Sequence, residues 1–180
     1  MTAIIFNFFQ MIIVVFGLPG TGKTFFAEQL AKEIKAEYLG SDNIRIEFSD
    51  DPAYSDREKD AVYQVIIHRL GNKIDTRKNH VVLDGTFYKK LYREMITQFT
   101  KSKGLVLVWF EMYAQETLIK ARLKKQRKYS KENIETYEVL KQEYEPCLYP
   151  HLCLESNDEN ISQLLRMSKK FLQENFHHIL

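Results

Sequence analysis

Residues 17–24 read Gly17-Leu18-Pro19-Gly20-Thr21-Gly22-Lys23-Thr24 and match the pattern G-x-x-x-x-G-K-[ST]. Glycines in such a segment allow backbone N–H groups to approach a phosphate without a Cβ in the way. An apolar run at 12–16 precedes the segment and a helix-forming stretch at 23–34 follows it, so a helix N-terminus would also face the anion. We expect Lys23 to reach the β- and γ-phosphates of a nucleoside triphosphate and Thr24 to offer its hydroxyl to Mg²⁺.

Apolar strands and helical stretches alternate along the rest of the chain. The pattern predicts strands at 12–16, 37–40, 81–84, 105–110 and 152–155. It predicts helices at 23–34, from 42 onward, and at 56–70, 88–100, 115–128, 130–144 and 161–176. Continuous apolar strands between helices are typical of a mostly parallel sheet that is covered on both faces. Because no repeat or linker interrupts this order, residues 1–180 are predicted to form a single α/β domain.

The composition is that of an ordinary globular protein, with 44% of the 180 residues hydrophobic and 28% charged. Lys and Arg number 26 and Asp and Glu number 24, so the net charge is only +2. A protein that binds nucleic acid through bulk electrostatics is usually far more basic, so a nucleic-acid partner is not favoured. Two cysteines cannot build a disulfide scaffold, and we therefore expect a reduced, cytoplasmic setting.

The first 16 residues are mostly apolar but do not predict a membrane segment. They carry no positive charge, lack a small-residue cleavage site and are shorter than the roughly 20 residues that span a bilayer. We expect residues 1–10 to form a peripheral N-terminus, with Met11 as an alternative start, and we expect no membrane partner.

Three classes of nucleotide-binding protein compete for this sequence: small kinases, GTPase switches and mechanical ATPases. Asn72-Lys73-Ile74-Asp75 matches the guanine-reading motif N-K-x-D, but we interpret it as a helix terminus and loop, because the motif belongs at the end of a late strand. Asp84 is followed by Gly85-Thr86-Phe87, so the D-x-x-G of a GTPase is missing there. A mechanical ATPase would usually carry an acidic pair where Asp84 supplies one carboxylate.

Two carboxylates follow predicted strands and should meet at one edge of a parallel sheet. Asp42 and Arg45 share one face of a starting helix. Asp42 would then accept the proton of an attacking hydroxyl, and Arg45 would hold the acceptor or the transferred phosphoryl group. The alternative is that Ser41 or Asp42 simply caps that helix. Asp84 is the candidate second Mg²⁺ ligand, with ordinary turn chemistry as its alternative.

Residues 117–131 contain seven basic side chains and no acidic one: Lys120, Arg122, Lys124, Lys125, Arg127, Lys128 and Lys131. The following stretch is acidic, so residues 117–145 are predicted to form a helical lid whose cations close over phosphates. Arg122 and Arg127 would lie about 140° apart on one helix, so both reach one phosphate only if that helix ends near Gln126. A solvated charged face is the alternative for most of the lysines, and a nucleic-acid groove is a third interpretation, with Tyr129 the lone aromatic nearby.

Two further groups of residues are open to more than one interpretation. Cys147, His151 and Cys153 include metal-ligand types, but no fourth ligand stands at a zinc-like spacing, and Cys153 is expected in the core of its strand. The acceptor pocket is expected between 42 and 68, where the aromatic rings of Phe48, Tyr54 and Tyr63 would pack on the acceptor.

Taken together, these segments resemble the small P-loop kinases, an AAA-type ATP-binding family related to polynucleotide kinase and zeta toxin. The resemblance covers residues 11–155 and rests on GLPGTGKT, on SDNIR at 41–45, on VVLDGTFYKKLYRE at 81–94 and on the basic lid segment. It implies a three-layer P-loop NTPase fold with a five-stranded, mostly parallel sheet, similar to nucleoside-monophosphate kinases and carrying a helical lid.

The same resemblance implies ATP-dependent phosphoryl transfer to a hydroxyl, with Asp42 as base, Arg45 as acceptor or phosphate ligand, and Arg122 and Arg127 as lid cations. Gly85 stands near the position where polynucleotide kinases often have Asn, and the lid arginines are more widely spaced than in that family. The first hypothesis is therefore a kinase for a small molecule or nucleotide. A polynucleotide 5′-hydroxyl kinase and an ATP-binding regulatory module with little catalysis are the alternatives.

Overall fold

The computed structural model describes residues 10–48, 56–76, 80–125 and 133–176. Its sheet consists of β1 (Met11–Phe16), β2 (Glu37–Gly40), β3 (Val81–Asp84), β4 (Val106–Tyr113) and β5 (Leu152–Glu155). The strand order is β2-β3-β1-β4-β5, and every neighbouring pair is parallel. The predicted five-stranded parallel sheet is therefore confirmed, although β4 extends to Tyr113 rather than ending at residue 110.

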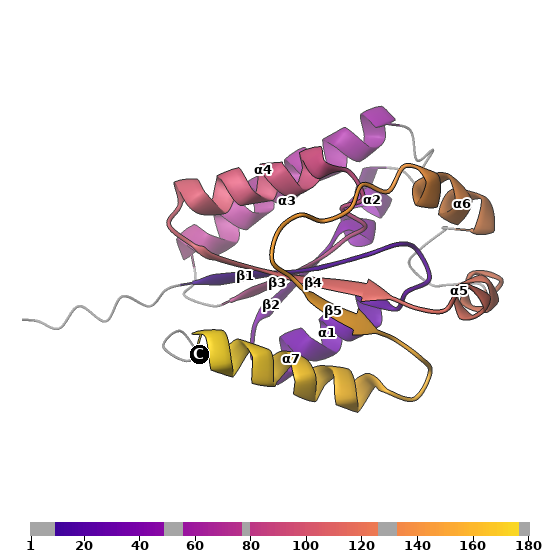
Figure 1. Cartoon of the computed structure of the whole chain (residues 1–180). Coiled ribbons are helices and arrows are strands. Elements are labelled where there is room, and N and C mark those ends of the chain that lie inside the picture. Colours follow the sequence, from indigo (N-terminus) through magenta and orange to yellow (C-terminus); the bar gives the residue numbers. More distant parts are fainter. Residues whose placement is uncertain (1–9, 49–55, 77–79, 126–132, 177–180) are drawn as a thin grey trace, which may run out of the picture.

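Helices cover both faces of the sheet, which gives the predicted three layers (Figure 1). α1 (Lys23–Glu33) and α7 (Ile161–Phe176) lie on one face, and α3 (Asp56–Thr76) and α4 (Lys90–Ser102) lie on the other. All six residues of β1 are fully buried, with alternate side chains packed into the two core clusters. Burial on both faces explains why this strand is a continuous apolar run in the sequence.

Three shorter helices lie toward the carboxyl ends of the strands (Figure 1). They are α2 (Ser41–Phe48), α5 (Glu116–Leu123) and α6 (Ile134–Gln142). The predicted helices at 115–128 and 130–144 are therefore too long. α5 ends before Lys124, and Asn133 is the N-cap of α6, where its side chain accepts a hydrogen bond from Thr136 N. Residues 126–132, which include Arg127, lie outside the described residues, as do residues 1–9 of the predicted peripheral N-terminus.

Two local predictions are corrected by the fold. α3 continues to Thr76, so Asn72-Lys73-Ile74-Asp75 lies in the last turns of this helix: the predicted helix terminus is confirmed, and the predicted loop is wrong. Cys153 is exposed rather than in the core. The reason is that β5 is an edge strand, and only Leu154 on its inner face is fully covered, by α7 and its neighbours.

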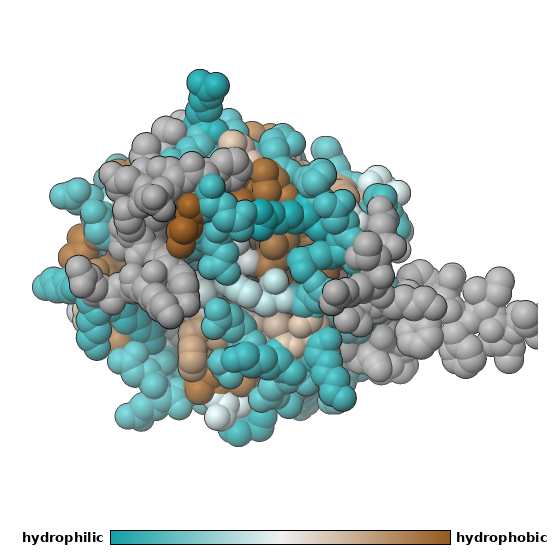
Figure 2. Space-filling view, turned by 180° about the vertical axis from the view of Figure 1, so that it is seen from behind, coloured by the Kyte–Doolittle hydropathy of each residue, from teal (hydrophilic) through white to brown (hydrophobic). Residues whose placement is uncertain are grey.

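The described surface is mainly hydrophilic on the face shown in Figure 2, where hydrophobic residues form small, separate patches. The large exposed hydrophobic side chains come from different elements: Phe25, Ile46, Leu91, Tyr113, Val139, Leu148 and Met167. Among the helices that the structure describes, none combines the length and the apolar character that crossing a bilayer requires.

Candidate functional site

The phosphate loop, residues 17–24, leaves β1 and ends in the first turn of α1. Gly17 has a φ of +141°, and a Cβ there would stand 2.1 Å from the carbonyl oxygen of Met112 on β4, so only glycine fits. The Thr21 hydroxyl donates to the Leu18 carbonyl oxygen over 2.8 Å, and Lys23 Nζ donates to the same oxygen over 3.0 Å. Lys23 is therefore folded back into the loop at the point where anions would bind.

Asp84, the last residue of β3, lies against the start of α1. The Thr24 hydroxyl donates to Asp84 Oδ2 over 2.7 Å, and the Tyr38 hydroxyl donates to the same oxygen over 3.2 Å. Asp84 Oδ1 is buried and has no hydrogen-bond partner within the described ranges. One oxygen is thus held by two hydroxyl groups, while the other accepts no hydrogen bond from the described residues.

Burial raises the pKa of Asp84 to about 6, because a carboxylate loses hydration inside the protein. Lys23 and the hydrogen bond from Thr24 lower the pKa and offset part of this effect, whereas the nearby Asp42 raises it further. The influence of Asp42 shows that the two predicted carboxylates share one electrostatic environment. A cation bound to Asp84 would favour its ionised form.

Asp42 stands in the first turn of α2, directly after β2. Arg45 Nη1 lies 3.4 Å from Asp42 Oδ1, and Arg45 Nε lies 3.3 Å from Glu58 Oε1 on α3. Arg45 is 9% exposed, so the guanidinium is fixed between two helices beside the carboxylate. The predicted pair of Asp42 and Arg45 is therefore in contact, and Glu58 is a partner that the sequence did not indicate.

Arg122 reaches from α5 back to the phosphate loop. Its Nη1 donates to the Gly20 carbonyl oxygen over 3.2 Å and to Ser156 Oγ over 2.9 Å. Its Nε and Nη2 donate to Asp158 Oδ1 over 3.1 and 2.9 Å. The Ser156 hydroxyl in turn donates to the Thr21 carbonyl oxygen over 2.6 Å. Of the two predicted lid arginines, Arg122 therefore contacts the loop, and Arg127 lies outside the described residues.

The described lysines of α5 and α6 pair with acidic side chains of the same two helices. Lys120 lies 2.7 Å from Glu116 and 2.9 Å from Glu138, and Lys141 lies 2.5 Å from Glu116. These side chains are largely exposed, so their ion pairs contribute little stability. They connect α5 to α6, which leaves Arg122 as the described basic residue of this segment that contacts the phosphate loop.

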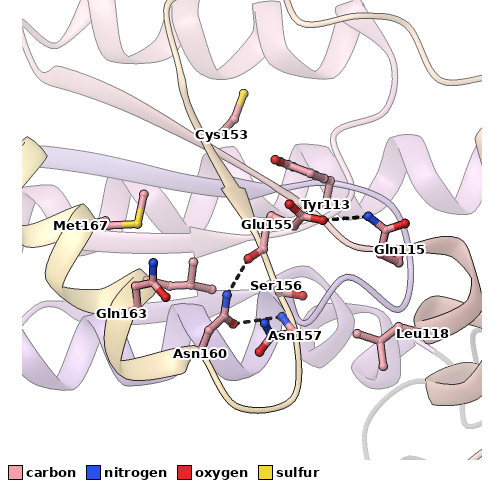
Figure 3. A pocket seen from close by; sticks show the side chains of 11 residues that line it. Tyr113, Gln115, Leu118, Cys153, Glu155, Ser156, Asn157, Asn160, Gln163 and Met167 are labelled. Carbon is pink, nitrogen blue, oxygen red and sulfur yellow. Dashed lines mark hydrogen bonds between the residues drawn. The ribbon is translucent and has the colours of Figure 1, made fainter.

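A cavity of about 210 Å³ opens beside Gly22 and is lined by Phe25, Arg122 and the residues that follow β5. A second cavity, of about 390 Å³, adjoins it along the edge strand β5 (Figure 3). Figure 3 shows that hydrogen bonds connect the polar residues in the wall of this second cavity. Asn160 Nδ2 donates to the Glu155 carbonyl oxygen, and Asn157 N donates to Asn160 Oδ1. The β5–α7 connection thus forms a wall shared by both cavities.

Tyr63 is not available to pack on an acceptor, contrary to the expectation from the sequence. Its ring stacks on Tyr92 at a centroid distance of 3.8 Å, and it is 4% exposed. Its hydroxyl accepts a hydrogen bond from Phe87 N over 3.0 Å. Tyr63 thereby supports the loop after Asp84. The side chain of Phe48 and the whole of Tyr54 lie outside the described residues.

Tyr38 and Ser156 contact the predicted site residues but were not predicted from the sequence. A Cβ on Gly40 would stand 2.4 Å from the Tyr38 hydroxyl, so the Tyr38 ring can fold over Gly40 toward Asp84. The glycine two residues after a strand tyrosine is a weak local signal for this arrangement. Ser156 has no comparable signal, because its partner Thr21 is 135 residues away in the sequence.

The AAA domain family matches the chain over residues 12–146. Among solved structures, a sugar kinase from Janibacter sp. HTCC2649 superimposes with a TM-score of 0.70 at 13% identity, over 96% of this chain and 99% of its own. A gluconokinase from Sinorhizobium meliloti 1021 gives 0.69 at 18% identity, over 94% and 97%. An APS kinase from Mycobacterium tuberculosis, in complex with AMPPNP and APS, gives 0.70 at 15% identity, over 92% and 98%.

No curated protein matches the chain at a significant level. At the identities of these solved structures, the likeness establishes the fold, which is that of the P-loop kinases. The predicted fold class is thereby confirmed.

Proposed function

The chain belongs to the AAA domain family, and from this premise we propose that it is an ATP-dependent phosphotransferase. It transfers the γ-phosphoryl group of ATP to a hydroxyl group of a small molecule or nucleotide. One observation supports the proposal: the phosphate loop, Asp84 and Asp42 lie at the carboxyl ends of β1, β3 and β2, which are neighbours in the sheet. In parallel α/β sheets, ligands bind outside the carboxyl ends of the strands.

The phosphate loop would hold the β- and γ-phosphates through its backbone N–H groups and the N-terminus of α1. Lys23 would exchange the Leu18 carbonyl oxygen for phosphate oxygens, a movement within reach of its flexible side chain. The cavity beside Gly22 would receive the nucleoside, with Phe25 and Arg122 in its wall. Arg122 and Arg127 are the cations that we assign to a lid formed by residues 117–145.

The hydroxyl of Thr24 and the carboxylate of Asp84 would hold Mg²⁺. The fit rests on the buried Asp84 Oδ1, which has no partner in the described part of the chain, and on the preference of Mg²⁺ for hard oxygen ligands. When bound, Mg²⁺ neutralises phosphate charge that develops during transfer.

Asp42 would orient the acceptor hydroxyl and take its proton. The acceptor oxygen forms a bond to the γ-phosphorus, the bond from that phosphorus to the β–γ bridging oxygen breaks, and ADP leaves with the bond electrons. Arg45 would contact the acceptor or the transferred phosphoryl group. Its contacts with Asp42 and Glu58 hold the guanidinium beside the base before any substrate arrives.

The test is transfer of labelled γ-phosphate from ATP to a panel of acceptors: nucleosides, sugars, aminoglycosides and 5′-hydroxyl oligonucleotides. We expect label in one acceptor class with the wild-type chain. Lys23→Ala should abolish transfer, and Asp42→Asn should slow it by about 10²- to 10⁴-fold, the usual range for a general base. The matched control is Glu47→Gln, an exposed acid on the same helix, which should retain the wild-type rate.

Label confined to oligonucleotides would identify a polynucleotide 5′-hydroxyl kinase instead. Tight ATP binding without transfer to any acceptor would overturn the proposal in favour of a regulatory module. Wild-type transfer by Lys23→Ala would show that the mechanism is wrong.

A further inference from the structure

Three side chains that can bind a metal ion converge between β4 and β5, outside the proposed active site. Glu111 on β4 and Cys153 on β5 are direct register partners, so their side chains leave the sheet together. His151 stands just before β5. The ligand atoms of Glu111, His151 and Cys153 all lie within 4.8 Å of one another.

The orientation of His151 is set by a backbone contact. Its Nδ1 lies 2.7 Å from the carbonyl oxygen of Tyr149. Because a carbonyl oxygen only accepts hydrogen bonds, Nδ1 carries a proton and donates it to this oxygen. Nε2 then faces Glu111 Oε2 at 3.0 Å. Metal-binding histidines commonly donate one ring N–H to a backbone carbonyl, which leaves the other nitrogen, here Nε2 on the Glu111 side, to bind the ion.

The other groups of the cluster are also held in place. The Tyr144 hydroxyl donates a hydrogen bond to Glu111 Oε1. The other carboxylate oxygen, Oε2, faces His151. The Tyr149 ring stacks on Trp109 at a centroid distance of 5.8 Å, and the Phe16 ring lies edge-on to His151 at 6.0 Å. Packing therefore fixes the segment that carries the histidine.

We propose that Glu111, His151 and Cys153 form a binding site for a divalent metal ion of the zinc type. One imidazole nitrogen, one carboxylate oxygen and one thiolate sulfur form a donor set that zinc accepts. Metal–ligand bonds of about 2.0–2.3 Å in a tetrahedron would separate the donor atoms by roughly 3.3–3.7 Å. The donor atoms lie within 4.8 Å of one another, so side-chain rotations that shift them by about 1 Å would bring them to that spacing.

The site would act as a clamp at the edge of the sheet. Cys153 is exposed, which provides an entry path for the ion and a position for water as the fourth ligand. The bound ion would join β4 to the edge strand β5 and to the segment that ends at His151. No residue of the phosphate loop is among the ligands, so this inference stands independently of the proposed function.

The experiment is a Co²⁺ titration of the full-length chain, freed of metal by a chelator and kept reduced. Thiolate coordination produces a charge-transfer band in the near ultraviolet. We expect the band to saturate at one Co²⁺ per chain and to disappear when Zn²⁺ is added. Binding of Co²⁺ between Thr24 and Asp84 produces no such band, since that site contains no sulfur.

Cys153→Ser should abolish the band, whereas Cys147→Ser, the matched control at the second free cysteine, should retain it. Glu111→Gln and His151→Gln should each weaken Zn²⁺ binding more than tenfold, and Tyr144→Phe about tenfold. Absence of saturable binding to the wild-type chain would overturn the proposal and leave His151 and Glu111 as an ion pair only. A band that survives Cys153→Ser would overturn it as well, even if that variant were less stable.

Discussion

The carboxyl group of Asp84 is buried, and in the absence of a ligand this burial disfavours its ionised form. Its pKa in the folded chain is about 6, above the ordinary 3.8, because burial outweighs the contacts with Lys23 and Thr24. Between those two pKa values the folded state binds more protons than the unfolded state. The contribution of Asp84 to stability is therefore greatest at low pH and falls as the pH rises through this window.

Asp84→Asn should stabilise the ligand-free chain at pH 7 by about 1–3 kcal/mol, since a shift of one pKa unit corresponds to about 1.4 kcal/mol. The gain should shrink toward zero near pH 4, where the wild-type carboxyl is protonated. Phosphoryl transfer should fall by about 10²-fold or more, because an amide is a poor Mg²⁺ ligand.

Urea unfolding at the two pH values and the transfer assay check both parts of this prediction. Glu159→Gln, which removes an exposed acid, is the control and should change stability by less than about 0.5 kcal/mol. An equal or lower stability of Asp84→Asn at pH 7 would contradict the assigned cost of burial.

The loop between β3 and α4 is held by Arg93, an almost fully buried residue of α4. Its Nη1 donates to the carbonyl oxygens of Phe87 and Tyr88 over 2.6 and 3.2 Å. Its Nη2 donates to those of Glu145 and Pro146 over 2.8 and 3.1 Å. Phe87 has a φ of +45°, which is unfavourable for a bulky residue, so these contacts maintain a strained loop directly after Asp84.

Arg93→Met should therefore destabilise the chain by about 3 kcal/mol or more, because four carbonyl oxygens, those of Phe87 and Tyr88 in buried hydrogen bonds, lose a charged donor. Arg93→Lys should be intermediate, since an ammonium group cannot span both pairs of carbonyl oxygens. Arg166→Met, which changes an exposed arginine of α7, is the matched control. Thermal or urea unfolding measures the effect. A loss of less than about 0.5 kcal/mol in the free energy of unfolding of Arg93→Met would refute this role of the Arg93 hydrogen bonds.

On the scale of the whole molecule, Arg122 and Ser156 join three parts of the chain. The Ser156 hydroxyl binds the phosphate loop at Thr21 and accepts from Arg122, which also pairs with Asp158. The phosphate loop, α5 and the β5–α7 connection are thereby linked across more than half of the sequence. The geometry of the loop depends on this link as well as on its own glycines.

Ser156→Ala should weaken ATP binding about tenfold, equivalent to about 1.4 kcal/mol, because the loop loses its anchor and Arg122 loses an acceptor. Isothermal titration with ATP provides the measurement. Ser168→Ala is the matched control, since the Ser168 hydroxyl on α7 is buried and has no hydrogen-bond partner in the described ranges. Unchanged ATP affinity in Ser156→Ala would mean that the loop keeps its geometry without the anchor.

Much of this architecture was predictable from local sequence. Residues 11–16 are apolar without interruption because both faces of β1 are buried, and the glycine at 17 is required by the close approach of β4. Periodicity and turn chemistry act over a few residues, so they reveal strands, helices and the phosphate loop. For the same reason Asp84 was recognisable as the carboxylate at the end of a strand.

The pairing of distant residues depended on the tertiary fold. β3 lies between β1 and β2, and β5 lies at an edge. Strand order results from long-range packing, and it brings Tyr38 to Asp84, exposes Cys153 and places Glu111 beside His151. Arg122 meets Ser156 only because α5 and the end of β5 meet beside the phosphate loop. Contacts of this kind have no periodic or adjacent signature in the sequence, so the chemistry of these residues became visible only when the sheet was assembled.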